Sequence, residues 1–251
     1  MAAPRFFVDQ PLSQGARVTL PDGVAHHARA VLRLRAGDPI VLFNGRGGEY
    51  RARLVAEHDA AARHLQADVN AFDPIEREAR LSITLIQALA TSDKIDWVIE
   101  KAVEVGVARV IVAPAARSTA RLDGVRRERR LQHWRELVIA ACSQCGRNTP
   151  ATVVAATSLA EALGQASEAH FKWILDPAAA PGLPPAAAEP RSTALAIGPE
   201  GGFDPQELQL AARSGFVPIS LGPRIFRTET AGLAAATAWL ALHAEFSVGP
   251  L

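Results

Sequence analysis

The sequence of 251 residues has only two cysteines, and it has no apolar run of the length that crosses a membrane. Its first residues also lack the apolar stretch of a signal peptide, so we expect a cytoplasmic protein. Cys142 and Cys145 form a C-x-x-C pair near the end of a predicted helix, where the helix dipole disfavours a thiolate. A zinc site would need two more ligands, and there is no second cysteine pair. We expect a structural role for both cysteines and no metal site.

Two common nucleotide-binding fingerprints are missing as well. No G-x-G-x-x-G motif follows the first strand of the predicted α/β region, residues 81–89, and no G-x-x-x-x-G-K-[ST] motif occurs. A Rossmann-type methyltransferase or dehydrogenase is therefore disfavoured.

Lysine is scarce, since 24 of the 27 basic residues are arginine. Residues 75–150 hold 13 basic and 9 acidic residues, whereas residues 151–251 hold 5 and 9. The middle of the chain is thus basic and the C-terminal part acidic. Arginine suits phosphate binding, but a GC-rich genome produces the same bias.

The first part of the chain favours short strands separated by turns, at residues 17–20, 39–43, 49–55 and 65–69. The glycine-rich segment 44–48 is typical of a hairpin turn. Residues 26–34 predict one short helix. The charged segment 72–80 predicts a linker after a small β-barrel.

Strands and helices alternate in the rest of the chain. Apolar runs predict buried parallel strands at residues 81–89, 107–113, 151–155, 171–175, 193–197 and 216–221. Helices are expected at residues 92–105, 125–146, 159–165, 205–214 and 229–246. Residues 178–191, rich in proline and alanine, predict a loop.

Two glycine-bearing turns follow apolar runs late in the chain. Residues 198–203 read Gly-Pro-Glu-Gly-Gly-Phe, and residues 221–227 read Leu-Gly-Pro-Arg-Ile-Phe-Arg. Strand, glycine turn and helix is the arrangement by which α/β proteins place backbone N–H groups beside a ligand. The two turns predict a ligand site, although connections in any α/β protein can hold glycine and proline.

With the Thr-Glu-Thr-Ala that follows, these turns resemble the 16S ribosomal RNA uridine-N3 methyltransferases, the small subunit methyltransferase E family of the SPOUT superfamily. The likeness covers the whole chain. It includes Pro-Arg-Phe-Phe at 4–7, His-Ala-Arg-Ala-Val-Leu-Arg at 27–33, Ile-Glu-Lys-Ala-Val-Glu-Val-Gly-Val at 99–107 and Ile-Ala-Ala-Cys-Ser-Gln-Cys-Gly-Arg-Asn at 139–148.

The resemblance implies an α/β fold: a SPOUT-type knotted parallel sheet with helices on both faces, preceded by a small PUA-like β-barrel. Residues 1–74 would form the RNA-binding barrel, and residues 75–251 a methyltransferase domain with a C-terminal trefoil knot. S-adenosylmethionine is the implied cofactor, bound among three loops. The residues expected to bind it are Leu175, Asp176, Ile197, Gly198, Gly201, Gly202, Leu221, Gly222, Ile225 and Arg227.

The implied methyl acceptor is N3 of a uridine in 16S rRNA of the small ribosomal subunit. This nitrogen carries a proton and is a poor nucleophile until the proton is lost, so a nearby group must accept the proton or stabilise the anion. Arg227 is the candidate stabiliser. Glu200 and Glu229 are candidate bases, although Glu229 could serve only the helix N-terminus. The alternatives are a SPOUT enzyme with another target, such as ribose 2′-O, and a non-catalytic rRNA-binding assembly factor.

The expected partners are 16S rRNA or the 30S subunit and a second copy of the chain. Six arginines are candidates for phosphate contacts, and the alternative is a solvated charged surface. They are Arg5, Arg29, Arg33, Arg35, Arg117 and Arg147. The homodimer rests on the superfamily resemblance and on the helix 229–246, which has almost no polar face. Such a helix is buried either in a subunit interface or within the monomer.

Overall fold

The computed structural model describes residues 3–55, 64–180, 182–186 and 192–247. The chain folds into two compact units, residues 1–78 with 142–150 and residues 79–141 with 151–251. The first unit is thus discontinuous in sequence, whereas the sequence predicts one boundary at residue 74. Part of the expected loop 178–191 lies outside the described residues.

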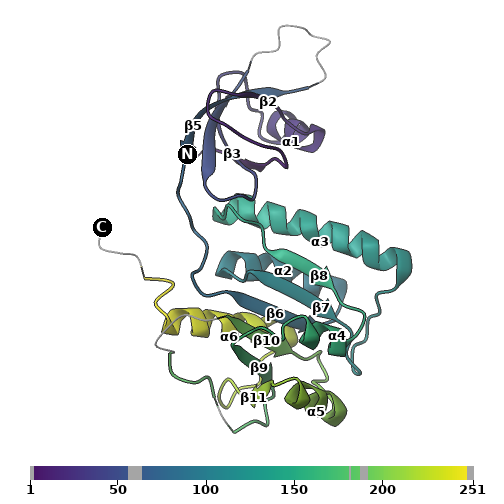
Figure 1. Cartoon of the computed structure of the whole chain (residues 1–251). Coiled ribbons are helices and arrows are strands. Elements are labelled where there is room, and N and C mark those ends of the chain that lie inside the picture. Colours follow the sequence, from purple (N-terminus) through teal and green to yellow (C-terminus); the bar gives the residue numbers. More distant parts are fainter. Residues whose placement is uncertain (1–2, 56–63, 181, 187–191, 248–251) are drawn as a thin grey trace. The chain divides into compact units, whose positions relative to one another are not determined.

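The first unit is built on a five-stranded sheet with the strand order β1-β3-β4-β5-β2 (Figure 1). In β4, Ala52 and Leu54 are buried while Arg51 and Arg53 are exposed, so one face packs on the core and the other meets water. Because β1 and β2 stand at the two ends of this strand order, the expected barrel is an open half-barrel. Its strands are β1 (Arg5–Phe7), β2 (Arg17–Thr19), β3 (Pro39–Phe43), β4 (Glu49–Leu54) and β5 (Gln66–Asp73).

The expected hairpin between β3 and β4 is confirmed by their antiparallel pairing. The three-residue strand β1 was not predicted; it pairs parallel to β3. The predicted helix 26–34 is instead a short helix, α1 (Asp22–His26), followed by a π-helical turn, η1 (His27–Val31). Arg33 has a φ of 55°, a left-handed conformation that cannot continue a right-handed helix.

The second unit contains a six-stranded sheet in which every neighbouring pair of strands is parallel. The strand order is β11-β9-β10-β6-β7-β8. All five residues of β10 are buried, as the continuous apolar run predicts. The strands are β6 (Ile83–Ala88), β7 (Arg109–Ala113), β8 (Thr152–Ala155), β9 (Phe171–Leu175), β10 (Thr193–Ile197) and β11 (Val217–Ile219).

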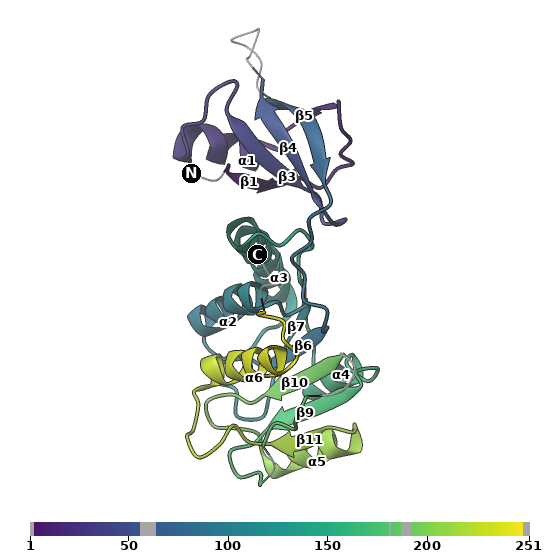
Figure 2. The same ribbon diagram turned by 90° about the vertical axis from the view of Figure 1, so that its left-hand side faces the viewer.

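Helices cover both faces of this sheet, as expected. Figure 2 shows α2 and α6 on one face and α4 and α5 on the other. A capping box between Asp204 and Glu207 sets the start of α5. The helices are α2 (Ser92–Val105), α3 (Gly124–Cys145), α4 (Leu159–Gly164), α5 (Pro205–Arg213) and α6 (Thr228–Leu242).

Most of the apolar side chains of α6 are buried within the second unit. Trp239 and Leu240 are fully buried, and Trp239 donates a hydrogen bond through Nε1 to Thr193 Oγ1 at 2.9 Å. The Trp239 ring also packs edge-on against Trp173, with ring centroids 4.6 Å apart. Burial of these two side chains therefore needs no subunit interface. The exposed positions of the helix are Thr237, Ala241 and Leu242.

Candidate functional site

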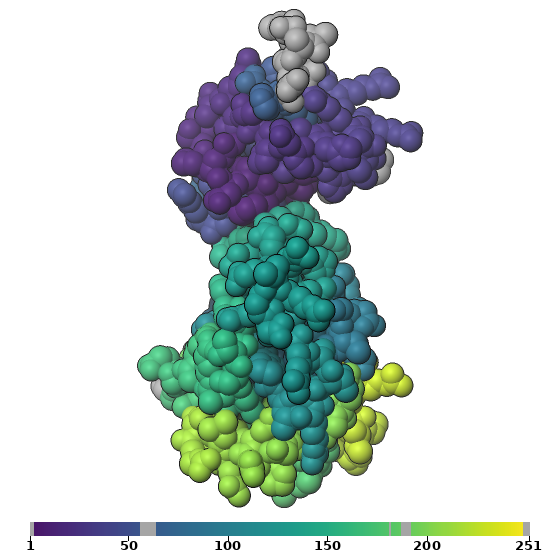
Figure 3. All heavy atoms as spheres, turned by 90° about the vertical axis from the view of Figure 1, so that its right-hand side faces the viewer, coloured from purple at the N-terminus to yellow at the C-terminus, as the bar shows by residue number. Residues whose placement is uncertain are grey.

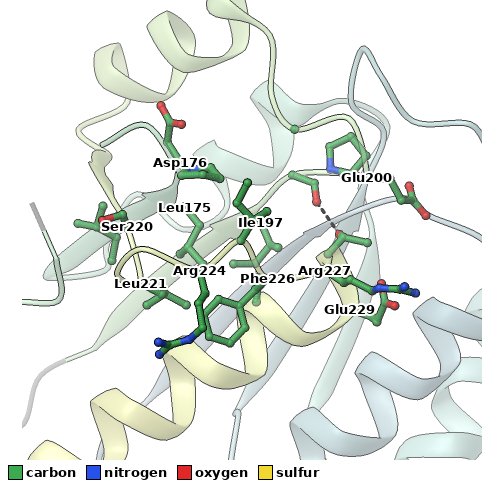
Figure 4. A pocket seen from close by; sticks show the side chains of 18 of the residues that line it. Leu175, Asp176, Ile197, Glu200, Ser220, Leu221, Arg224, Phe226, Arg227 and Glu229 are labelled. Carbon is green, nitrogen blue, oxygen red and sulfur yellow. Dashed lines mark hydrogen bonds between the residues drawn. The ribbon is translucent and has the colours of Figure 1, made fainter. Parts of the chain in front are cut away.

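Three neighbouring strands, β11, β9 and β10, end at the same edge of the parallel sheet, and the loops that follow them enclose a pocket of about 450 Å³ (Figure 4). The carboxyl ends of parallel strands are where open α/β sheets bind ligands. The volume is in the range of small-molecule sites. The sheet thus brings together two glycine turns and the loop after β9, which are well separated in sequence.

The first glycine turn is tightly folded. The backbone N–H of Gly202 donates to the carbonyl of Pro199 at 2.9 Å, and Gly202 has a φ of +70°. A Cβ on Gly198 would lie 3.1 Å from the backbone nitrogen of Phe203, so the turn itself crowds a side chain there. A Cβ on Gly202 would meet open space, and Gly202 lines the pocket. A side chain at this second position would occupy ligand volume.

Apolar side chains form most of the pocket wall. Figure 4 shows Leu175, Ile197, Leu221 and Phe226 around it. Asp176, by contrast, uses its carboxylate to accept a hydrogen bond from the backbone N–H of Ala178 at 2.9 Å. An apolar wall suits a flat heterocycle and a thioether or sulfonium chain. These residues therefore fit S-adenosylmethionine.

Charged side chains gather at one end of the pocket, where Figure 4 shows Arg227, Glu229 and Glu200. Lys94 from α2 joins them: its Nζ donates to Glu200 Oε1 at 2.9 Å and lies 3.4 Å from Glu229 Oε2. The hydrogen bond from Lys94 holds the pKa of Glu200 below its ordinary value, and the pKa of Lys94 is raised in turn. Glu200 is therefore an anion at neutral pH.

The sequence-predicted site residues largely come together. Every expected cofactor residue except Gly201 lines the pocket, and so do the three expected catalytic residues. Gly201 instead packs against Arg117, whose side chain a Cβ at this position would meet at 3.2 Å. Lys94 and Thr228 also line the pocket and were not predicted. A signal for Lys94 exists, because it is one of only three lysines in an arginine-rich sequence.

Three of the six candidate RNA-contacting arginines are exposed on the first unit. Arg29 lies in η1, and Arg33 and Arg35 follow it. Val31 and Leu32 between them are exposed as well, at 63% and 40%. This segment, residues 29–35, presents charge and apolar surface together.

Arg5 and Arg147 lie in a buried network within the first unit. Arg5 is paired with Glu49 and donates to Asn148 Oδ1 at 2.7 Å. Arg147 is 5% exposed and its Nε donates to Glu78 Oε2 at 2.7 Å. Buried charges persist in proteins when they are paired and hydrogen-bonded, as these are. Both side chains thus serve the packing of the first unit, contrary to the expected exposed phosphate contacts.

Arg117 lies in the loop between β7 and α3, a segment that Figure 3 shows in teal at the surface of the second unit. Its side chain donates to the carbonyl oxygen of Gly201 at 2.7 Å. The backbone N–H of the preceding residue, Ala116, donates to Glu207 Oε1 at 2.7 Å. The loop is therefore hydrogen-bonded both to the first glycine turn and to α5.

Cys142 is buried and Cys145 half-buried in the last turn of α3, and they form no disulfide. Within the described residues no three His, Cys, Asp or Glu side chains are grouped so as to hold a metal ion. None of the helices in the described part of the chain is long and apolar enough to span a membrane.

Comparison with protein families gives two matches along the chain. Residues 77–240 match the model of an RNA methyltransferase domain. Residues 20–62 match the model of an RNA methyltransferase PUA domain. The two matches follow the order of the two units.

Individual proteins are similar over nearly the whole chain. The ribosomal RNA small subunit methyltransferase E of Mycobacterium bovis is 33% identical over 243 residues, which are 94% of this chain and 90% of that protein. The crystal structure of the enzyme of the same name from Neisseria gonorrhoeae, bound to S-adenosylmethionine, is 37% identical with a TM-score of 0.88 and covers 96% of this chain and 98% of that one. A methyltransferase from Legionella pneumophila with the same bound cofactor is 30% identical with a TM-score of 0.89, over 96% and 98% of the two chains.

Proposed function

The chain belongs to the ribosomal RNA small subunit methyltransferase E family, and we propose that it methylates N3 of a uridine in 16S rRNA with S-adenosylmethionine as the cofactor. The observation that carries this proposal is the pocket at the ends of β9, β10 and β11. It joins an apolar wall suited to the cofactor with a charged end suited to a uracil ring. The ribosomal substrate implies a cytoplasmic location. The trefoil knot stays a prediction.

When bound, S-adenosylmethionine supplies a methyl group on a positively charged sulfur. The uridine N3 must lose its proton, and the electron pair left on nitrogen forms the new N–C bond while the pair of the C–S bond stays with sulfur. Glu200 and Glu229 are the candidate proton acceptors at the charged end. Arg227 would stabilise negative charge on the uracil oxygens beside N3. In this proposal the chain contributes proton removal and charge stabilisation.

Phosphate contacts would come from the exposed segment 29–35 of the first unit. Arg29, Arg33 and Arg35 place three guanidinium groups within seven residues. Phosphate contacts position a protein on RNA without reading its sequence, so this surface does not identify the nucleotide.

A homodimer through the second unit is also part of the proposal. The outward face of α6 carries Ala234, Ala238 and Ala241 at helical spacing, and Leu242 beside them is 47% exposed. Small apolar residues allow two helices to approach closely. Ile225, in the loop before α6, is 81% exposed and would extend such a surface toward the pocket.

Mass spectrometric mapping of rRNA tests the function. Wild-type protein incubated with S-adenosylmethionine and small-subunit RNA, naked or as 30S particles, should yield one N3-methyluridine. Methylation on a ribose 2′-oxygen would identify another kind of target. An absence of cofactor binding in calorimetry would favour a non-catalytic assembly factor.

A further inference from the structure

One cation lies between the two carboxylates that are candidate proton acceptors. Lys94 is in the first turn of α2, Glu200 is in the turn after β10, and Glu229 is in the first turn of α6. Lys94 is 106 residues before Glu200 in sequence, and its side chain is only 26% exposed. Three separate elements of the second unit therefore meet at this lysine.

Lys94 binds the carboxylates of Glu200 and Glu229 at different distances. Lys94 forms a 2.9 Å hydrogen bond with Glu200, whose pKa this bond lowers. Glu229 Oε2 is inaccessible to water and forms only a longer ion pair with the same Nζ, at 3.4 Å, while the Glu229 side chain as a whole stays 17% exposed. Because Glu229 lines the pocket, the accessible part of its carboxylate can accept a hydrogen bond from a bound ligand. The N3–H group of a uridine is a donor of the required kind.

We propose that Lys94 is a positioning residue for methyl transfer: anchored to Glu200, it holds Glu229 at the pocket with one carboxylate oxygen left to accept the N3 proton. The inference rests on the proposed function and assigns different tasks to the two candidate bases. Glu200 is the counter-ion that fixes the lysine. Glu229 is the proton acceptor.

The electrostatic surroundings of Glu229 come from each element packed around it. Lys94 faces it from the start of α2, and Glu200 from the turn after β10 and Arg227 from the start of its own helix line the same pocket. Removing Lys94 leaves two neighbouring carboxylates without the cation between them. The hydrogen bond that lowers the pKa of Glu200 is then lost and like charges disfavour the ionised form, so Glu200 should hold a proton up to higher pH.

Single-turnover methylation of a 16S rRNA fragment by Lys94→Met tests this assignment. The rate should fall by about tenfold to a hundredfold, within the range of general acid–base effects. The affinity for S-adenosylmethionine in calorimetry should stay within about twofold, because the lysine contacts carboxylates rather than the apolar wall. The acid limb of the pH–rate profile should move to higher pH. Lys94→Arg, which keeps the positive charge, should restore most of the rate.

A second measurement needs no methyl transfer. In the presence of S-adenosylhomocysteine, wild-type protein should bind a fragment with uridine about tenfold more tightly than the same fragment with N3-methyluridine, since only uridine donates N3–H to a carboxylate. Lys94→Met and Glu229→Gln should both lose this preference. Glu200→Gln should keep part of it.

The matched control is Lys101→Met, seven residues further along α2, where the lysine pairs with Glu100 and Glu104. It should leave rate, pH profile and binding preference unchanged. A Lys94→Met protein that matches the wild type in all three readouts would overturn the inference, as would equal losses in Glu200→Gln and Glu229→Gln. If the wild-type protein forms no N3-methyluridine, the proposed function itself fails.

Discussion

Thr228 Oγ1 donates a hydrogen bond to the carbonyl oxygen of Gly198 at 2.5 Å and so ties the first turn of α6 to the first glycine turn (Figure 4). The same hydroxyl accepts a hydrogen bond from Gln87 Nε2 at 2.9 Å. Gln87 is 1% exposed and lies in β6. One buried chain of hydrogen bonds thus links β6, α6 and the wall of the pocket. The position of the cofactor turn depends on a residue that was not predicted.

Thr228→Val should weaken cofactor binding and reduce stability together. The substitution keeps the shape but removes the hydroxyl that bonds to the Gly198 carbonyl and to Gln87 Nε2, at a cost of about 1–3 kcal/mol in the free energy of unfolding. Calorimetry with S-adenosylmethionine and thermal unfolding measure the two effects. Thr228→Ser keeps the hydroxyl and should retain both the cofactor affinity and the thermal stability. An unchanged cofactor affinity in Thr228→Val would show that the turn is held by other contacts.

Gly202→Val should abolish cofactor binding in a protein that stays folded. Gly202 has a φ of +70° with open space around its Cβ direction, and it lines the pocket. The side chain would enter that space, and the left-handed backbone adds about 1–2 kcal/mol of strain. Gly37→Val is the control, because Gly37 has a φ of +87° and equal space but lies in the first unit. It should carry similar strain and bind the cofactor normally.

The parallel sheet and both glycine turns were predictable from local sequence. Continuous apolar runs specify strands buried on both faces, as in β10, and glycine with proline marks the turns that follow them. The short strands were the elements that the sequence predicted least well. Three residues, as in β1, are too few to show an alternating pattern.

Long-range pairing is what the sequence could not show. Arg5 and Arg147 are as basic in sequence as Arg33, yet their partners Glu49 and Glu78 are 44 and 69 residues away. Nothing local distinguishes an arginine that will be buried in an ion pair from one that will face water. Lys94 was missed for the same reason, since only the folded sheet brings it to Glu200.

Glu49→Gln should destabilise the first unit in a pH-dependent way. Burial raises the pKa of Glu49, but hydrogen bonds from Arg77 and Arg5 outweigh this effect and hold it below the ordinary value of 4.5. A carboxyl group with a lowered pKa stabilises the folded state above that value, and the contribution is lost as the pH falls through the folded pKa.

The variant should therefore lose about 2 kcal/mol in the free energy of unfolding at neutral pH, where the largely buried Arg5 and the more exposed Arg77 lose the carboxylate that they share. The difference from wild type should shrink as the pH falls below 4.5. Thermal unfolding midpoints against pH measure it. Asp68→Asn removes the exposed partner of Arg17 and should change little. A pH-independent loss in Glu49→Gln would point to packing rather than charge.

Substitution of the exposed arginines in segment 29–35 should lower the salt dependence of RNA binding. Each lost phosphate contact reduces the slope of log affinity against log salt by about one. Arg33→Ala and Arg35→Ala should therefore each reduce it, with thermal stability unchanged because both side chains are exposed. Arg17→Ala, an exposed arginine on β2 paired with Asp68, is the control. Equal slopes in all variants would leave these charges as a solvated surface.

Ala238→Glu and Ala241→Glu should convert a dimer into a folded monomer. Ala241 is exposed and Ala238 half-buried, so a carboxylate at either position can reach water in a single chain but would be buried if a second copy covered the helix. Light scattering at micromolar concentration should show a wild-type dimer and monomeric variants, with thermal unfolding of the variants little changed. Leu240→Asp is the contrasting variant, because Leu240 is fully buried within the second unit and the charge should unfold that unit.

A wild-type monomer that still methylates RNA would rule out the dimer, and dimeric Ala238→Glu protein would place the interface elsewhere. If the monomeric variants also lose cofactor affinity, the exposed loop with Ile225 depends on the partner subunit for its shape.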